Sequence, residues 1–160
     1  MPSKPVVDAV DARILSALSD DPRASVIALA DRAGLSRNTV QARLARIEER
    51  DVLQTFERRI DPAALGYPLS AFILTRVVQR KLDAIADELA SVPEVLEVHG
   101  LSGSVDLLVQ VVARDGDDLY RIAGRVLDID GVEQTTTSLV MRQLLGYRVK
   151  PLLAGLMSQR

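Results

Sequence analysis

The tripeptide Gly-Leu-Ser at residues 34–36 separates two helical patterns, and it restricts the fold of this chain more than any other feature. Gly34 suits the residue just after a helix, where a positive φ costs little only for glycine. Ser36 suits the N-cap of the next helix, because its hydroxyl can accept hydrogen bonds from free amides. Leu35 and Val40 hold the positions of a hydrophobic staple, which fixes how the second helix leaves the turn. The pattern predicts two helices joined by a tight turn.

Another helix is predicted ahead of this pair. Asp8 suits its N-cap, Asp11 in the first turn favours the helix dipole, and apolar side chains recur with helical spacing over residues 14–18. Residues 19–22 end this helix, because the last of them is a proline. The helix before the turn begins near Ser25. Three helices are therefore expected within the first fifty residues.

The third of these helices has one apolar face and one polar face. Val40, Leu44 and Ile47 recur at i, i+4 and i+7 and so face the core. The opposite side carries small side chains together with groups that can hydrogen-bond base edges and phosphates. Such a pair is typical of a helix-turn-helix, in which the second helix enters the major groove of DNA; an ordinary helical hairpin is the alternative. The predicted DNA contacts are Ser36, Arg37, Asn38, Thr39, Gln41, Ala42, Arg43 and Arg46.

The distribution of charge fits this interpretation better than the total does. The net charge is −2, whereas DNA-binding domains are often basic. Residues 32–50, however, hold five arginines against two glutamates, and the acidic excess lies after residue 60. A solvated helix face is the alternative explanation for the arginines.

The next segment is expected to join two domains. Residues 52–60 contain β-branched and aromatic residues and predict a strand or wing-like extension, in which Arg58 and Arg59 either touch phosphate or are solvated. Residues 61–68 are turn-rich and bounded by two prolines, so they predict a linker. The expected organisation is a helix-turn-helix domain at 1–60, the linker at 61–68 and a second domain at 69–160.

The second domain reads as a duplicated β-α-β pattern. The expected strands are residues 69–78, 95–99, 106–112 and 132–139, with amphipathic helices after the first and third. Val92-Pro93-Glu94-Val95 echoes Ile129-Asp130-Gly131-Val132 at matching places of the two halves. The order predicts an α+β, βαββαβ ferredoxin-like domain, with four antiparallel strands and both helices on one face.

The other face of that sheet is expected to be covered. The strands are apolar on both sides, and exposed apolar surfaces of this size are rare on monomers. A second subunit is the expected cover, so the domain predicts an oligomerisation platform. The tail, residues 144–160, is expected either to extend the sheet or to lie across a neighbouring subunit.

Taken together, the motifs resemble those of the Lrp/AsnC, or feast/famine, family over nearly the whole chain. The matching motifs are Asp8-x-x-Asp11-x-x-Ile14-Leu15, Leu29-Ala30-x-x-x-Gly34-Leu35-Ser36, Val40-x-x-Arg43-Leu44-x-x-Ile47-Glu48, Ile60-Asp61-Pro62 with Leu65-Gly66-Tyr67, Gly103-x-x-Asp106-Leu107, and Gly131-Val132 through Thr137. The resemblance implies a sequence-specific transcriptional regulator that binds double-stranded DNA. It also implies a homodimer that assembles to an octamer or similar ring and binds an amino-acid effector between subunits.

The resemblance places the effector near a glycine loop and a threonine-rich strand; the residues it implies are Gly103, Ser104, Asp106, Thr135, Thr136 and Thr137. A carboxylate such as Asp106 could pair with an α-ammonium group, although a simple hairpin turn explains the same loop equally well. This chain departs from the family at Asp51, where glycine is usual, and at residues 104–105, where an aromatic side chain is common. The second departure puts the effector preference in doubt.

Other functional classes find little support. His99 is the only histidine and the chain has no cysteine, so a histidine-based metal site or catalytic triad has no partners. No GxxxxGK[ST] phosphate loop occurs. A non-enzymatic, cytoplasmic protein without a required cofactor or a membrane segment is therefore expected. A ligand-independent architectural DNA-binding protein is the alternative to an effector-responsive regulator.

Overall fold

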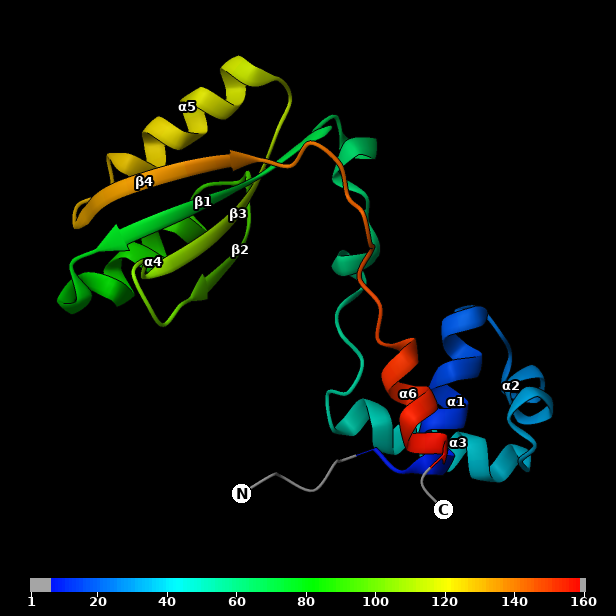
Figure 1. Ribbon diagram of the computed structural model, residues 1–160. Helices are drawn as coiled ribbons and strands as arrows, with labels where there is room; N and C mark the ends of the chain where they lie inside the picture. Colours follow the sequence, from blue (N-terminus) through cyan, green and yellow to red (C-terminus); the bar gives the residue numbers. More distant parts are fainter. Residues whose placement is uncertain (1–6, 159–160) are drawn as a thin grey trace. The chain divides into compact units, whose positions relative to one another are not determined.

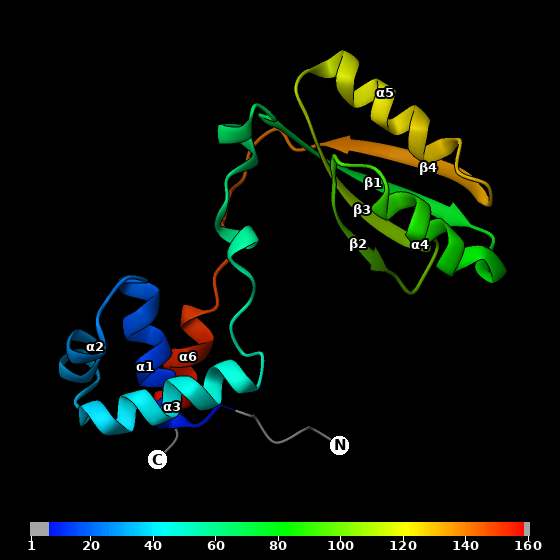
Figure 2. The same cartoon turned by 180° about the vertical axis from the view of Figure 1, so that it is seen from behind.

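The computed structural model describes residues 7–158 and contains two compact units (Figures 1 and 2). The helical unit comprises the chain up to Phe56 together with the segment from Leu145 onward. The sheet unit comprises Glu57–Leu144. The boundary between the units thus lies after Phe56, on the N-terminal side of the linker predicted at residues 61–68. The second domain predicted at residues 69–160 is also divided, because the segment from Leu145 onward belongs to the helical unit.

The helical unit contains α1 (Ala9–Asp20), α2 (Val26–Ala33), α3 (Arg37–Glu49) and α6 (Lys150–Ser158). The two predicted N-caps, Asp8 and Ser36, are confirmed, because the side chain of each accepts a hydrogen bond from an amide of the helix that follows. Ser25, near which the second helix was expected to begin, caps α2 in the same way. At α1 the cap is reciprocal, since Asp11 also accepts the Asp8 amide. Local chemistry thus fixes where each of these helices begins.

Two helix ends share one hydrogen-bond pattern. At the end of α2, Gly34 has φ +62° and the Leu35 amide donates to the Ala30 carbonyl, as in a Schellman motif. At the end of α3, Asp51 has φ +50° and the Val52 amide donates to the Ile47 carbonyl. Asp51, where the family resemblance leads us to expect glycine, is thus held in a left-handed conformation.

The C-terminal tail forms the fourth helix of the helical unit. Leu153 of α6 is buried with Ala12 and Leu15 of α1 and Ile47 of α3. Lys150 forms an ion pair with Asp20 at the end of α1. The expectation that the tail extends the sheet was wrong, because its apolar side chains pack in the helical core instead.

The strand predicted at residues 52–60 was also wrong. The segment contains a short 3₁₀ helix, η1 (Phe56–Arg59), and a second one, η2 (Pro62–Leu65), follows. Val52 packs in the core beside Ile47 as part of the cap after α3, so its β-branched side chain serves a helix end. The described residues accordingly form a helix-turn-helix without a wing strand.

The sheet unit contains β1 (Leu69–Val77), η3 (Gln79–Lys81), α4 (Leu82–Ala90), β2 (Val95–Gly100), β3 (Leu107–Ala113), α5 (Gly116–Leu127) and β4 (Val132–Leu139). The four strands lie in the order β2-β3-β1-β4, and every neighbouring pair is antiparallel. This arrangement confirms the predicted βαββαβ domain.

The internal echo in the sequence corresponds to two equivalent turns. The Val95 amide donates to the Val92 carbonyl at 3.0 Å, and the Val132 amide donates to the Ile129 carbonyl at 3.0 Å. Each turn leads from a helix into a strand, and both Val92 and Ile129 are buried. The duplication is therefore structural as well as sequential.

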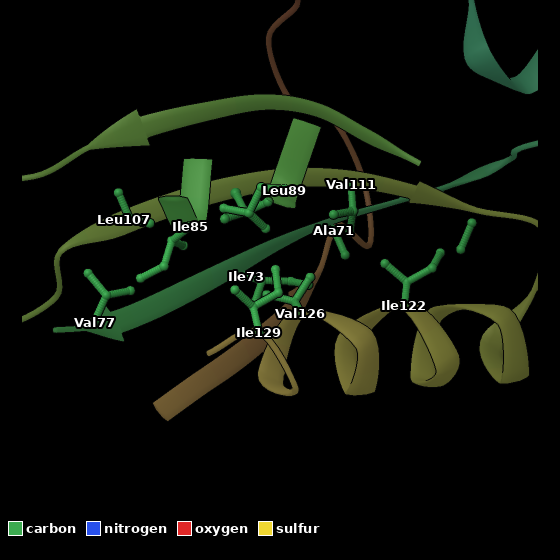
Figure 3. Close-up of a cluster of buried hydrophobic side chains, with 12 residues drawn as sticks. Ala71, Ile73, Val77, Ile85, Leu89, Leu107, Val111, Ile122, Val126 and Ile129 are labelled. Carbon is green, nitrogen blue, oxygen red and sulfur yellow. The ribbon is translucent and has the colours of Figure 1, made fainter. Parts of the chain in front are cut away.

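One face of the sheet carries the core. Alternate residues of β1 and β3 point to this face, and both helices contribute side chains to the same cluster (Figure 3). Its fully buried members are Ala71, Ile73, Ile85, Leu89, Val109, Val111, Ala113, Ile122 and Val126. Both helices therefore cover one face, as predicted.

The opposite face is apolar only along its middle. Phe72 and Leu74 of β1 lie beside Leu108 of β3, and all three are half-buried. The outer strands add polar groups, such as Glu97 on β2 and Thr136 on β4. The expectation of strands apolar on both faces thus holds for the two central strands alone. Within residues 7–158, no helix is long and apolar enough to cross a membrane.

Candidate nucleic-acid interface and effector site

The surface of α3 divides the predicted DNA contacts into two groups. Five of the eight are exposed: Ser36, Arg37, Asn38, Gln41 and Ala42. With Ala45, they form a continuous outer stripe with helical spacing. Within residues 7–158, the side chains of Arg37, Asn38 and Gln41 make no hydrogen bond or ion pair, so their donors are available to a ligand.

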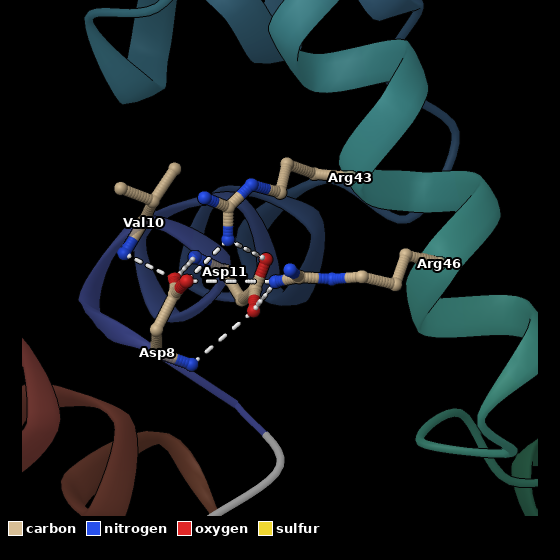
Figure 4. A network of polar contacts seen from close by, with 5 residues as sticks. All are labelled: Asp8, Val10, Asp11, Arg43 and Arg46. Carbon is tan, nitrogen blue, oxygen red and sulfur yellow. Dashed lines mark hydrogen bonds and ion pairs between the residues drawn. The ribbon is translucent and has the colours of Figure 1, made fainter.

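Thr39, Arg43 and Arg46 form the second group, on a half-buried flank of the same helix. The Thr39 hydroxyl lies 2.8 Å from the hydroxyl of Ser36, the N-cap of α3. The two arginines turn toward the start of α1 (Figure 4). The sequence pattern placed Thr39 and Arg46 on the outward-facing side and Arg43 beside it, whereas the structure separates all three from the outer stripe.

Two aspartates at the start of α1 form ion pairs with both arginines. Arg43 forms ion pairs with Asp8 and, at 3.1 Å, with Asp11. Arg46 lies 2.5 Å from Asp11 and 3.5 Å from Asp8. The side chain of Asp11 is only 2% exposed, whereas that of Asp8 is 48% exposed. Two carboxylates thus face two guanidinium groups across the junction of α1 and α3.

The network perturbs the ionisation of its members. Desolvation acts to raise the pKa of Asp8, but hydrogen bonds from the Asp11 amide and the Arg43 guanidinium outweigh it and hold that pKa well below its usual range. The pKa of Arg43 is raised, chiefly by its hydrogen bonds to Asp8 and then to Asp11. Both groups therefore stay charged at neutral pH.

The sequence pattern assigned Asp8 to the N-cap of α1 and Asp11 to its helix dipole, and it missed their contact with α3. One signal was available, since Arg43 and Arg46 stand one helical turn apart and a pair of carboxylates occupies the first turn of α1. Which arginines meet which carboxylates depends on how the helices cross, and helical periodicity alone does not give that angle.

In the sheet unit, Asp106 lies at the end of the loop between β2 and β3. Its carboxylate accepts hydrogen bonds from the Val77 amide at 2.9 Å and the Gln79 side chain at 2.6 Å. Gly103 in the same loop has φ +130°, and Ser104 is exposed. The loop is a strand connection in which the carboxylate already has two partners, so the hairpin interpretation has direct support.

The three threonines do not share one surface. Thr135 pairs with Thr75 and Thr137 with Ile73, on the side of the sheet that carries the helices. Thr136 pairs with Leu74 on the opposite side. Only two of the three predicted threonines can therefore line any one face.

Asp106 and the threonines lie on opposite sides of β1. The strand order places β3, which Asp106 precedes, on one side of β1 and β4 on the other. Two strand spacings are roughly 10 Å, several times the separation of the ammonium and carboxylate groups in one amino acid. The described chain alone does not bring these groups together around one small ligand, and within residues 7–158 no cluster of metal-ligating side chains occurs.

Two family models match this chain. One, the AsnC-type helix-turn-helix domain, matches residues 7–48. The other, the Lrp/AsnC ligand binding domain, matches residues 70–149, half of the chain. Helix α6 lies outside both matches.

Individual relatives agree with these models. The chain is 32% identical to the HTH-type transcriptional regulator FL11 of Pyrococcus horikoshii over 85% of this chain and 90% of that protein. It is 36% identical to the HTH-type transcriptional regulator AldR of Mycolicibacterium smegmatis over 88% and 84%. Among solved structures, a feast or famine regulatory protein from M. tuberculosis complexed with L-methionine superposes with a TM-score of 0.79 at 29% identity, covering 89% of this chain and 97% of that one. The chain belongs to the Lrp/AsnC family.

Proposed function

We propose that this protein is a transcriptional regulator that binds specific sites in double-stranded DNA through α3 and responds to an amino acid. The outer stripe of α3 is the observation that carries the proposal. Arginine, asparagine and glutamine side chains project there without intramolecular partners, and two alanines keep the stripe narrow enough to enter a groove. The similarity to HTH-type transcriptional regulators over more than four-fifths of the chain supports the same function.

Within this proposal, Ser36, Arg37, Asn38, Gln41 and Ala42 contact DNA directly. Asn38 and Gln41 are suited to adenine, because an amide can donate to and accept from one edge of that base. Arg37 and Ser36 stand at the start of the helix, where phosphate contacts are common. Thr39, Arg43 and Arg46, the three partly buried members of the predicted set, have internal partners and are not among the residues proposed to contact DNA directly.

Assembly is part of the proposal. The middle of the open sheet face exposes parts of Phe72, Leu74 and Leu108, and a second copy of the chain is the proposed cover. Such a dimer presents two α3 helices to half-sites about one helical turn apart, or a multiple of that distance. Further association into an octamer or similar ring, in the cytoplasm, completes the proposed arrangement.

The effector is proposed to bind between sheet units of neighbouring chains, at the Gly103–Asp106 loop of one and the Thr135–Thr137 strand of another. Two chains are needed, because within one chain these groups are too far apart for one amino acid. The relative complexed with L-methionine makes that amino acid the first to test. An effector that prefers one arrangement of subunits shifts the population of DNA-binding assemblies.

A gel-shift titration tests this function. The purified chain is titrated onto duplex DNA from the region upstream of its own coding sequence, alone and with each of the twenty amino acids. A retarded band altered by one amino acid is expected. No retarded band at any concentration contradicts the proposal.

An architectural DNA-binding protein without an effector is the second candidate. The specific observation in its favour is the Asp106 carboxylate, which already accepts two internal hydrogen bonds and so needs no ammonium partner. The same titration separates the candidates, because retardation indifferent to all twenty amino acids supports the architectural role.

A further inference from the structure

We infer that Arg43 and Arg46 are positioning residues, which set the angle of α3 on α1 and do not serve as DNA ligands. The inference rests on the proposed DNA binding and assigns two different roles to residues of α3. The outer stripe reads DNA, and the two arginines hold the stripe in place.

The contacts of the two arginines are the first argument. Both guanidinium groups reach both carboxylates at the start of α1, with Arg46 at 2.5 Å and Arg43 at 3.1 Å from Asp11 (Figure 4). The arginines are only 26% and 34% exposed, so much of each side chain is already packed. An arginine whose guanidinium group is bound to two carboxylates has few free donors for a phosphate.

The burial of Asp11 is the second argument. Its side chain is 2% exposed, and it accepts hydrogen bonds from both arginines and from the Asp8 amide. Removing one partner from a buried ion pair leaves an uncompensated charge, which is strongly unfavourable. Moving either arginine to DNA would leave the buried Asp11 carboxylate with one guanidinium group in place of two, so the network resists the exchange.

The position of the network on the helix is the third argument. The buried residues of α3, Val40 and Ile47, determine which side of the helix faces the core, but apolar contacts are non-directional and tolerate small rotations of the helix about its axis. Arg43 and Arg46 stand one turn apart on the flank and make directional contacts with another helix. They therefore restrict the remaining rotation of α3 and so the angle at which it presents the outer stripe.

Charge gives the fourth argument. Two arginines and two aspartates cancel, so the network as a whole adds no net attraction for phosphate. Arg37, which has no ion pair within residues 7–158, remains to provide that attraction at the start of the helix. The two kinds of arginine should therefore respond differently to salt.

The first test compares Arg46→Ala with its matched control, Arg37→Ala, in DNA titrations over a range of salt concentrations. All measurements are made well below the unfolding temperature of each variant. For Arg37→Ala, the slope of log affinity against log salt should fall in magnitude by about one. For Arg46→Ala, affinity should fall about tenfold with the slope of the unaltered chain. A fall of about one in the slope of Arg46→Ala overturns the inference and leaves the proposed function intact.

The second test uses the sign of the effect. Asp8→Asn removes one negative charge beside the interface, while asparagine keeps the ability to cap α1. If the arginines were DNA ligands, freeing them from a carboxylate would strengthen binding. A positioning role predicts the reverse, a loss of about threefold in the affinity of the folded chain. Unchanged or tighter binding overturns the inference.

The two proposals fail differently. A chain that retards no duplex contradicts the proposed function and removes the basis of this inference. A chain that binds DNA normally but tightens its binding in Asp8→Asn contradicts the positioning role alone. A purely structural role lowers the unfolding temperature of Arg46→Ala and leaves the DNA affinity of the folded fraction unchanged, which also overturns it.

Discussion

In each unit a buried aspartate in the first turn of a helix binds two arginines, but the arginines come from different distances along the chain. In the helical unit, the partners of Asp11 are Arg43 and Arg46, on another helix. In the sheet unit, the partners of Asp118 are Arg114, four residues away at 3.2 Å, and Arg121, three residues away at 2.7 Å.

The same kind of ion pair therefore has two structural roles, one local and one tertiary. The Asp118 contacts are mostly local and stabilise the start of α5, with Glu94 of a distant loop as an added partner of Arg121 at 2.5 Å. The Asp11 contacts are tertiary and join two helices. A local network tolerates small movements of the fold, whereas a tertiary one specifies a single arrangement, as a helix that reads DNA requires.

Replacing each aspartate by alanine tests this contrast and should give the largest effect. Asp11→Ala should lower the free energy of unfolding of the helical unit by about 3 kcal/mol, because two cations lose a buried partner. Asp118→Ala should cause a smaller loss, confined to the sheet unit. Hydrogen exchange of α3 and α5 amides in the full chain reads the units separately. Equal losses in the two units would contradict the contrast.

Leu153→Ala tests whether the stability of the helical unit also depends on apolar contacts between residues far apart in the sequence. Leu153 is 9% exposed beside Ala12, Leu15 and Ile47, and its truncation should cost about 2 kcal/mol. Exposed Leu152, on the same helix, is the control, and Leu152→Ala should change stability by less than about 0.5 kcal/mol. Chemical denaturation measures both, and identical midpoints for the two variants would exclude α6 from the core.

Asp51→Gly should have the opposite sign. Asp51 occupies a left-handed conformation at φ +50°, which glycine adopts without strain. The substitution should stabilise the helical unit by about 1 kcal/mol, and thermal unfolding measures it. Gly34→Ala, at φ +62° after α2, is the reciprocal change and should destabilise the unit. Destabilisation by Asp51→Gly would show that the aspartate has another role.

Acidification should produce the smallest and broadest effect. The pKa of Asp118 is lowered by its hydrogen bonds from Arg114 and Arg121, and that of Asp8 is lowered despite desolvation. A carboxylate with a depressed pKa in the folded state stabilises the fold above its unfolded pKa of about 4 and loses that contribution as the pH falls further. Stability should therefore decline below about pH 4 in both units. The decline for Asp8→Asn should be shallower in the helical unit, and equal declines would contradict the assignment.

Much of the fold could be predicted because its signals are local. Caps at Asp8 and Ser36, a helix start near Ser25 and the left-handed turn at Gly34 need only neighbouring residues, and the structure confirms each. The repeated turns before β2 and β4 are local as well. The order of the elements then restricts the sheet to few topologies.

The missed features depend on distant contacts. Val52 suits a strand by its own preference, but here it packs against Ile47 and closes a helix end. The tail gave no clear pattern, because the partners of Leu153 lie near the other end of the chain. The turn of Arg43 and Arg46 away from the outer stripe likewise depends on carboxylates more than thirty residues away. Helical periodicity identifies a face but not its neighbour.

Selection from a pool of random duplexes tests the central claim, sequence-specific DNA binding through the outer stripe of α3, most directly. The account predicts that repeated retention on the purified chain enriches a motif with two half-sites about 10 to 10.5 base pairs apart, or a multiple of that spacing. It also predicts that Gln41→Ala, on the outer stripe, relaxes the preference at individual positions of the motif. Retention of DNA without any enriched motif would contradict the claim, and so would a motif that Gln41→Ala leaves unchanged.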